Sequence, residues 1–212
     1  MAKITRIETQ KRNKDRVNIY LDDRYAFAVN AELVYREGLK VNLEVDEEKL
    51  HNLSKNENLL KCKETALRII ERSYKTEKEI KEKLREKGYD SEEIIKVLGF
   101  LKEYNFINDE SYMKMYIKDR LKSQGREKIK YALLRKGIDS DLIEEELNSI
   151  DMDEERNIAV ELATKKYLVL IKRENDKYKL WNKLCRFLVG KGYKYSIAKE
   201  VVQEVCHMED IN

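Results

Sequence analysis

The pattern of apolar and polar positions changes its period once along the chain, close to Asp46. Before this point apolar residues alternate with polar ones, as in Arg16–Leu21, where Val17, Ile19 and Leu21 share one face. After it, apolar residues recur every three or four positions almost to the end of the chain. A period of two predicts strands, and a period near 3.6 predicts amphipathic helices. The chain is therefore expected to begin with a small sheet and to continue as helices.

Three strands are predicted in the first segment. They cover Ile4–Thr9, Arg16–Leu21 and Arg24–Val29, and the third places Tyr25, Phe27 and Val29 on one face. The polar stretch Lys11–Asp15 and the pair Asp22-Asp23 have the composition of turns. We expect these strands to form an antiparallel three-strand meander.

A short helix is predicted directly after the sheet, over Ala31–Glu37. Asn30 is a suitable N-cap for it, and Gly38 is suited to end it. Three short strands are only marginally stable by themselves. The sheet is therefore expected to pack on this helix or on the domain that follows.

Helices are predicted from Asp46 onward. The run Asp46-Glu47-Glu48 can start the first of them, and a longer helix covers Asn58–Tyr74. The polar stretch Asn56–Asn58 is either a break between the two or part of one continuous helix.

An internal repeat is the strongest pattern in the helical part. Three Lys-Gly pairs, ending at Gly88, Gly137 and Gly192, align together with the apolar residues around them. The aligned apolar positions lie eight and four residues before the glycine and six, ten and thirteen residues after it. They hold Ile80, Leu84, Ile94, Leu98 and Leu101 in the first copy, Ile129, Leu133, Ile143, Leu147 and Ile150 in the second, and Leu184, Leu188, Ala198, Val202 and Val205 in the third.

The spacing of these columns predicts two helices per copy with the glycine at the turn between them. Glycine fits the left-handed residue that ends many helices, and Asp90 and Asp139 can cap the helices that follow. A further helix upstream completes three helices per repeat, over about 63–74, 110–122 and 153–173. Because each repeat buries little surface alone, the repeats are expected to stack.

The predicted fold is mainly α, with three tandem three-helix repeats in an elongated curved array behind a small N-terminal antiparallel β meander and short helix. The expected domains are the β-rich extension 1–55 and the repeats 56–109, 110–152 and 153–212. The composition agrees, since the chain has no proline and only seven glycines. Charged residues make up 40% of it, against about 25% in ordinary domains, which suits helices with solvated outer faces.

The composition also indicates the compartment. No apolar run approaches the ~20 residues of a membrane span, and the first residues lack the apolar core of a signal peptide. The three cysteines are scattered, which does not suggest a disulfide framework. We expect a cytoplasmic, monomeric protein with no membrane association.

No catalytic pattern is found in the sequence. The chain has two histidines, and the adjacent pair Cys206-His207 lacks the further ligands that a zinc site needs. Gly190-Lys191-Gly192 lacks the spacing of a phosphate-binding loop, and the repeat explains Gly192 as a helix stop. We therefore expect no enzymatic activity, no metal and no cofactor.

The charge distribution is more informative. Residues 118–136 hold eight Lys or Arg against two acids, whereas 139–155 hold nine Asp or Glu and no base. Residues 177–194 again carry six bases and no acid, while the bases of the first repeat alternate with glutamates. The candidate contact residues for a partner or DNA are Arg72, Lys75, Lys118, Arg120, Lys122, Arg126, Lys128, Lys130, Arg135, Lys136, Lys183 and Arg186.

Two interpretations of these cations stay open. They are either ordinary solvated helix faces, or a basic stripe that meets an acidic protein surface or a nucleic-acid backbone. Tyr112, Tyr116 and Tyr131 lie within or beside the basic stretch and are either core residues or contact residues.

Four parts of the helical region form a recognisable pattern: Ala66–Ser73 followed by Glu79–Leu84, then Tyr104–Glu110, and Tyr116–Arg120 with Gly125 and Leu133–Ile138. These stretches resemble the RecX family, bacterial regulators of the RecA recombinase. The N-terminal strands are similar to the extension carried by RecX proteins of Gram-positive bacteria. The resemblance covers nearly the whole chain.

The resemblance implies a protein that binds the RecA–DNA filament along its groove. It implies restraint of RecA's ATP hydrolysis, strand exchange and co-protease activity, and it needs no catalytic residue. An autonomous DNA-binding module that acts without RecA is the alternative, and a structural protein with another filament or acidic partner is a third.

Overall fold

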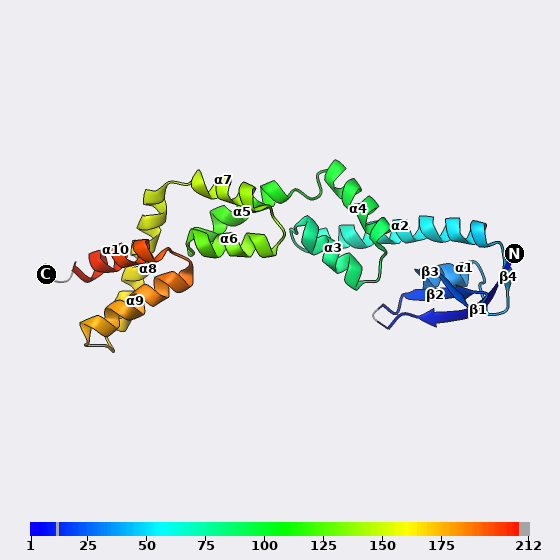
Figure 1. Cartoon of the computed structure of the whole chain (residues 1–212), viewed down its shortest axis with the longest axis horizontal. Helices are drawn as coiled ribbons and strands as arrows, with labels where there is room; N and C mark the ends of the chain where they lie inside the picture. Colours follow the sequence, from blue (N-terminus) through cyan, green and yellow to red (C-terminus); the bar gives the residue numbers. More distant parts are fainter. Residues whose placement is uncertain (12, 208–212) are drawn as a thin grey trace. The chain divides into compact units, whose positions relative to one another are not determined.

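The computed structural model describes residues 1–11 and 13–207, so Arg12, inside the predicted first turn, lies outside the described part. The chain divides between Asn108 and Asp109 into two compact units, and the described residues before and after this point are here called unit 1 and unit 2 (Figure 1). Unit 1 holds the strands β1 (Ala2–Thr9), β2 (Arg16–Leu21), β3 (Arg24–Asn30) and β4 (Glu44–Val45) and the helices α1 (Ala31–Arg36), α2 (Glu47–Arg72), α3 (Glu77–Glu86) and α4 (Ser91–Glu103). Unit 2 holds α5 (Asp109–Arg120), α6 (Arg126–Arg135), α7 (Ser140–Asn148), α8 (Met152–Leu170), α9 (Lys177–Lys191) and α10 (Tyr195–His207).

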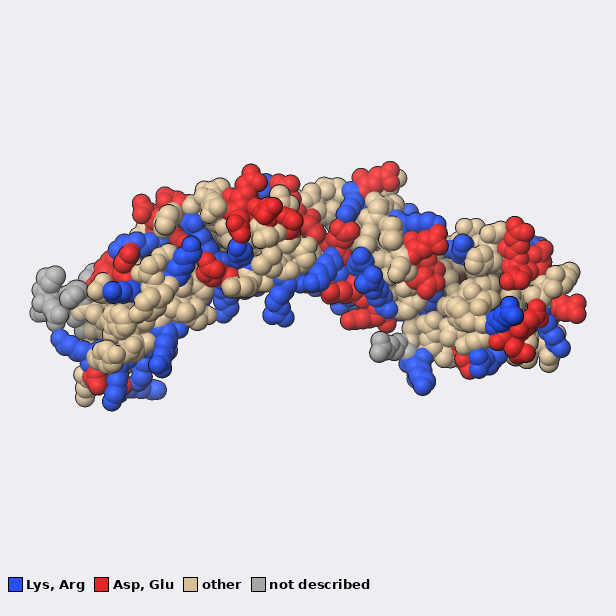
Figure 2. Space-filling view, in the orientation of Figure 1, with Lys and Arg blue, Asp and Glu red and all other residues tan. Residues whose placement is uncertain are grey.

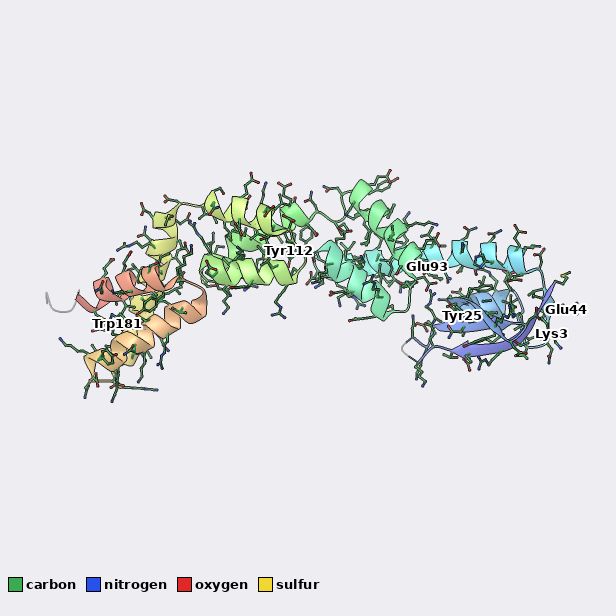
Figure 3. The ribbon with its side chains drawn as sticks, viewed as in Figure 1. Lys3, Tyr25, Glu44, Glu93, Tyr112 and Trp181 are labelled. Atoms are coloured by element: carbon green, nitrogen blue, oxygen red, sulfur yellow. The ribbon has the colours of Figure 1, made fainter. Side chains whose placement is uncertain are left out.

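The sheet of unit 1 has four strands in the order β3-β2-β1-β4, and all neighbouring pairs are antiparallel. The three-strand prediction was one strand short. The fourth strand is the two-residue β4, in which Glu44 pairs with Lys3 and Val45 with Ala2. Lys3 and Glu44 lie together at one end of the sheet (Figure 3). Two residues are too few to show a period of two, so the sequence carried no signal for this strand.

The β2–β3 hairpin confirms most of the predicted alternation. Asp22 and Asp23 have φ values of 45° and 63°, as a two-residue hairpin turn of the mirror-image type requires. The prediction that Tyr25 lies on one face with Phe27 and Val29 was wrong, since Tyr25 is 54% exposed whereas Phe27 and Val29 are buried. The register shifts near Tyr20, so that Ile19 pairs with Phe27 but Tyr20 pairs with Tyr25. An extra residue in one strand turns the following side chains to the opposite face.

The sheet packs on both of the elements that the sequence offered. Leu33 of α1 and Leu50 of α2 are buried in one cluster with Ile4 and Ile19. The short helix begins as predicted, because the Asn30 side chain accepts a hydrogen bond from the Glu32 backbone.

Helix α2 runs without a break through Asn56–Asn58 and therefore crosses the domain boundary predicted at 55/56. Asn58 is 4% exposed, and its Nδ2 donates to the carbonyl of Ala28 in β3 at 2.5 Å. Of the two alternatives left open for this stretch, the continuous helix is the one observed, and Asn58 anchors the sheet on it. The first half of α2 belongs to the sheet's core, and the second half, with Cys62 and Ala66, belongs to that of repeat 1.

The repeat columns form the cores of the three helical repeats. Every aligned position eight and four residues before the glycine is fully buried, with 0% exposure in all three copies. The positions after the glycine are buried too, apart from Ile150, which is partly buried. Gly88, Gly137 and Gly192 have φ values of 83°, 85° and 97°, so each occupies the left-handed conformation predicted for it.

Repeats 2 and 3 contact each other directly inside unit 2. The N–H of Gly125, the N-cap of α6, donates to the carbonyl of Lys191 at 3.0 Å, and that of Glu127 donates to the carbonyl of Gly192 at 3.1 Å. A Cβ atom on Gly125 would overlap the carbonyl of Gly192 and lie 2.6 Å from the backbone nitrogen of Tyr193. We call this contact the repeat 2–3 junction.

Gly137→Ala is expected to destabilise the protein by about 1–2 kcal/mol, because an L side chain is strained at a φ of 85°. Gly99→Ala is the matched control, since Gly99 lies inside α4 with open space around it. That change should stabilise by about 0.5–1 kcal/mol. Urea unfolding of both variants measures the difference, and an equal effect of the two would contradict the role of the left-handed turn.

Candidate partner and nucleic-acid interface

The charges of unit 2 are separated by helix. Figure 2 shows Asp and Glu side chains gathered over α7, and Lys and Arg side chains along α6 and α9. This follows from the sequence, because 139–155 supply acids alone and 118–136 and 177–194 supply mostly bases. We call the exposed candidates of this unit the basic face: Lys118, Arg120, Lys122, Lys128, Arg135, Lys183 and Arg186.

The ends of α5, α6 and α9 bring some of these cations together. The turn after α5 carries Lys122 and leads to Gly125, whose backbone bonds to the end of α9. Lys128 lies beside that end, since its Nζ donates to the carbonyl of Gly190 at 3.3 Å. Lys122 and Lys128 of repeat 2 therefore lie at the repeat 2–3 junction, beside the end of α9, where an anionic partner could meet them together.

Arg126 has a structural position inside this junction and does not belong to the exposed basic face. Its Nε lies 2.7 Å from Oε2 of Glu155, its Nη2 donates to the carbonyl of Ile150 at 3.0 Å, and its side chain is 17% exposed. The backbone N–H of Arg126 also donates to Oε1 of Glu155 at 3.1 Å. A guanidinium held in this way is not available to a partner.

Three further candidates are engaged within the unit. Lys130 pairs with Glu144 of α7, which raises the pKa of the lysine and lowers that of the carboxyl group. Lys136 lies over the ring of Tyr112, 5.2 Å from its centroid. On α9, Lys183 pairs with Glu174 at 2.8 Å, and this hydrogen bond lowers the pKa of Glu174.

The tyrosines of the basic stretch differ in burial, and the contact role stays a prediction for Tyr131. Tyr112 is buried in repeat 2 (Figure 3), and its ring stacks on that of Tyr116 with centroids 6.0 Å apart. Tyr131 is 65% exposed on α6, three residues after Lys128 and four before Arg135. That spacing places the three side chains on one face of the helix. An aromatic ring between two cations suits contact with stacked bases as well as with protein.

The two candidates of unit 1 lie at the end of α2 and in the segment that follows it. Arg72 is exposed in its last turn, where a cation also suits the helix dipole. Lys75 is partly buried in the segment before α3. Both stay predictions as contact residues.

Sequence reasoning missed Glu155. It is 4% exposed although it belongs to the acidic run that looked like a solvated face. Gly125 carried a weak signal, since it is one of the few glycines and lies just before a helix. Neither the need for glycine nor the burial of the carboxylate is visible without the contact between repeats.

The described residues contain no group of three or more His, Cys, Asp and Glu side chains that could hold a metal ion, and the side chain of His207 lies outside this description. In the same part of the chain, no helix combines the length and the apolar character needed to cross a lipid bilayer.

Architecture and surface together define a tandem helical-repeat protein with an N-terminal sheet. Four family models match it in succession: the regulatory protein RecX N-terminal domain at residues 2–46, and the first, second and third three-helix domains of RecX at 62–101, 108–147 and 153–202. The chain belongs to the RecX family of regulatory proteins.

Regulatory RecX proteins of other bacteria are similar to the chain over nearly its full length. The chain is 53% identical to the regulatory protein RecX of Clostridium beijerinckii over 205 residues, which cover 97% of this chain and 96% of the relative. It is 38% identical to that of Clostridioides difficile over 212 residues, with 99% of each chain covered.

Solved structures of the family have the same fold. A crystal structure of regulatory protein RecX superimposes with a TM-score of 0.65 at 27% identity, covering 95% of this chain and 98% of that one. RecX from Lactobacillus salivarius gives 0.62 at 26% identity, covering 70% and 96%. The predicted mainly α fold with three three-helix repeats is confirmed.

Proposed function

We propose that this protein binds the RecA filament on DNA and modulates RecA, mostly by inhibition. The activities affected are ATP hydrolysis, strand exchange and co-protease function, and the setting is homologous recombination, DNA repair and the SOS response in the cytoplasm. The observation that carries the proposal is membership of the regulatory RecX family in all four domains, together with the separated charges of unit 2. The protein acts as a monomer and by binding alone.

The basic face supplies the affinity in this proposal. A RecA–DNA filament is a repeating anionic surface, and a face of cations held by two packed repeats can meet several of its charges at once. Such binding is reversible and weakens as salt rises. No bond is made or broken in the partner, so the effect on ATP hydrolysis arises from the state of the filament that the bound protein favours.

Reversal of Lys118, Lys122 and Lys128 to Glu is expected to raise the concentration needed for half-inhibition of RecA by about tenfold or more. The three side chains are exposed, and the change removes one hydrogen bond of the junction, from Lys128 to the carbonyl of Gly190, so the fold should survive. The readout is ATP hydrolysis by RecA on single-stranded DNA. Arg126 is left unchanged because reversing it would break its pair with Glu155.

The matched control reverses three exposed lysines of unit 1, Lys40, Lys49 and Lys96, for the same change in net charge. Equal loss in the two variants would mean that net charge, and not the basic face, sets the affinity. No effect of the wild-type protein at stoichiometric amounts would overturn the RecA proposal itself.

An autonomous DNA-binding module is the second candidate, and the exposed cations around Tyr131 favour it. It requires binding to DNA alone with a steep salt dependence. Full inhibition of RecA by a variant that has lost binding to free DNA would exclude it.

A further inference from the structure

Unit 1 contains a polar cleft that the basic face does not include. It has a volume of about 470 Å³ and lies between the β1–β2 turn, the start of α1, the second half of α2 and the turn after α3. Arg68 and Arg72 line it from successive turns of α2, and Lys87 lines it from the Lys-Gly turn of repeat 1. Only Arg72 among these three was a candidate from the sequence.

The wall formed by the β1–β2 turn is held in place by repeat 1. Nδ2 of Asn13 donates to the carbonyl of Lys87 at 2.6 Å. Arg16, 2% exposed at the start of β2, places its guanidinium 4.8 Å from the ring centroid of Tyr89. Tyr89 is fixed in turn, since its hydroxyl donates to the carbonyl of Lys61 at 3.1 Å. The cleft is therefore built by tertiary contacts.

Positive charge dominates the lining. It holds the cations Arg16, Lys61, Arg68, Arg72 and Lys87 against the acids Asp15 and Glu32. Lys61 is neutralised by Glu32 at 3.1 Å, and Arg68 lies 3.5 Å from Glu64 on its own helix. Among the residues that the structure describes, no carboxylate pairs with the side chain of Arg72 or Lys87.

The chemistry of the lining favours one kind of ligand. Ala31 and Ile69 are its only aliphatic members, so it offers no pocket for the apolar side chains of a peptide. Guanidinium groups bind phosphate oxygens through paired hydrogen bonds. Lys11 and Lys14, exposed on the same turn as Asn13, extend the charge beyond the cleft.

We infer that this cleft binds the phosphodiester backbone of DNA, with Arg68, Arg72 and Lys87 as the contacting cations. The inference adds a DNA contact in unit 1 to the proposed function, and it does not require that RecA be present. The N-terminal sheet then has a functional role, because it forms one wall of the site.

The test uses the full-length protein and a fluorescein-labelled single-stranded oligonucleotide, with anisotropy measured over a range of salt concentrations. Arg68→Glu with Arg72→Glu is expected to weaken binding about tenfold or more. Two lost phosphate contacts should also lower the slope of log K against log salt by about 1.4. Lys40→Glu with Lys49→Glu, two exposed lysines of the same unit and the same change in charge, should leave the slope unchanged.

Equal weakening by the two double variants would overturn the inference, and so would undetectable binding of the wild-type protein at low salt. An Arg68/Arg72 variant that binds DNA normally but no longer inhibits RecA would show that the cleft faces protein, which also overturns it. Failure here leaves the RecA proposal standing, because that proposal is tested by RecA's ATP hydrolysis. Circular dichroism of each variant checks that the fold is retained.

Discussion

Replacing Glu155 with alanine is expected to destabilise unit 2 by about 3–5 kcal/mol. The carboxylate is 4% exposed and neutralises the partly buried guanidinium of Arg126, while it also accepts the backbone N–H of that residue. Its removal leaves a cation in the junction with the carbonyl of Ile150 as its remaining partner. Breaking one side of a buried pair costs more than the pair contributes, because the remaining charge is no longer compensated.

The control is Glu154→Ala, since Glu154 is the exposed neighbour in the same first turn of α8. Urea denaturation of the two variants compares their free energies of unfolding. The double variant Arg126→Met with Glu155→Met should recover much of the stability, since no unpaired charge remains. An effect of Glu155→Ala no larger than that of Glu154→Ala would contradict the buried ion pair.

Gly125→Val is expected to destabilise the protein by about 3 kcal/mol, through steric overlap and the loss of two backbone hydrogen bonds. The φ and ψ of Gly125 are −78° and 164°, which any residue can adopt. The loss of stability therefore does not arise from backbone strain. It begins with steric overlap, because a Cβ would overlap the carbonyl of Gly192. The N–H groups of Gly125 and Glu127 would then lose their acceptors at the end of α9.

Gly190→Ala is the matched control for this prediction. Gly190 lies inside α9 with open space around it, so alanine should stabilise the helix by about 0.5–1 kcal/mol. Thermal unfolding of the two variants measures both changes in stability. If Gly125→Val unfolds at the wild-type temperature, the contact between repeats 2 and 3 is not formed as described.

The two junction variants also bear on function. The basic face is shared between α5–α6 and α9, and the junction fixes these helices relative to each other within unit 2. Under the proposed function, inhibition of RecA by either variant is therefore expected to weaken even under conditions where each repeat stays folded.

The helical repeats were predictable because the burial of a helix face depends on residues that are close together in the sequence. A column of apolar residues at helical spacing must lie on one face, and that face is buried, as Ile80, Ile129 and Leu184 show with 0% exposure. The glycine after each lysine was equally clear, because a helix that ends in a left-handed residue favours glycine wherever it occurs. The turn-like composition of Asp22-Asp23 likewise located the hairpin turn.

The candidate site was predictable only in outline. The distribution of charged residues along the sequence indicated which helices carry the cations. Lys118, Lys122 and Lys128 are exposed in the structure. Whether a given cation is free or paired depends on residues far away in the chain. Arg126 is held by Glu155, 29 residues later, so its position in a basic run gave no indication of its burial.

What the sequence by itself determined here is the burial of each helix face and the position of each turn, since both depend on neighbours within a few residues. The tertiary structure alone decided which polar residues are buried, as with Arg16, Asn58 and Glu155. It also decided that a turn of the sheet and a turn of repeat 1 would enclose a cationic cleft. Burial of a polar group is tolerated only when a distant partner completes its hydrogen bonds or its charge, and no local pattern records that partner.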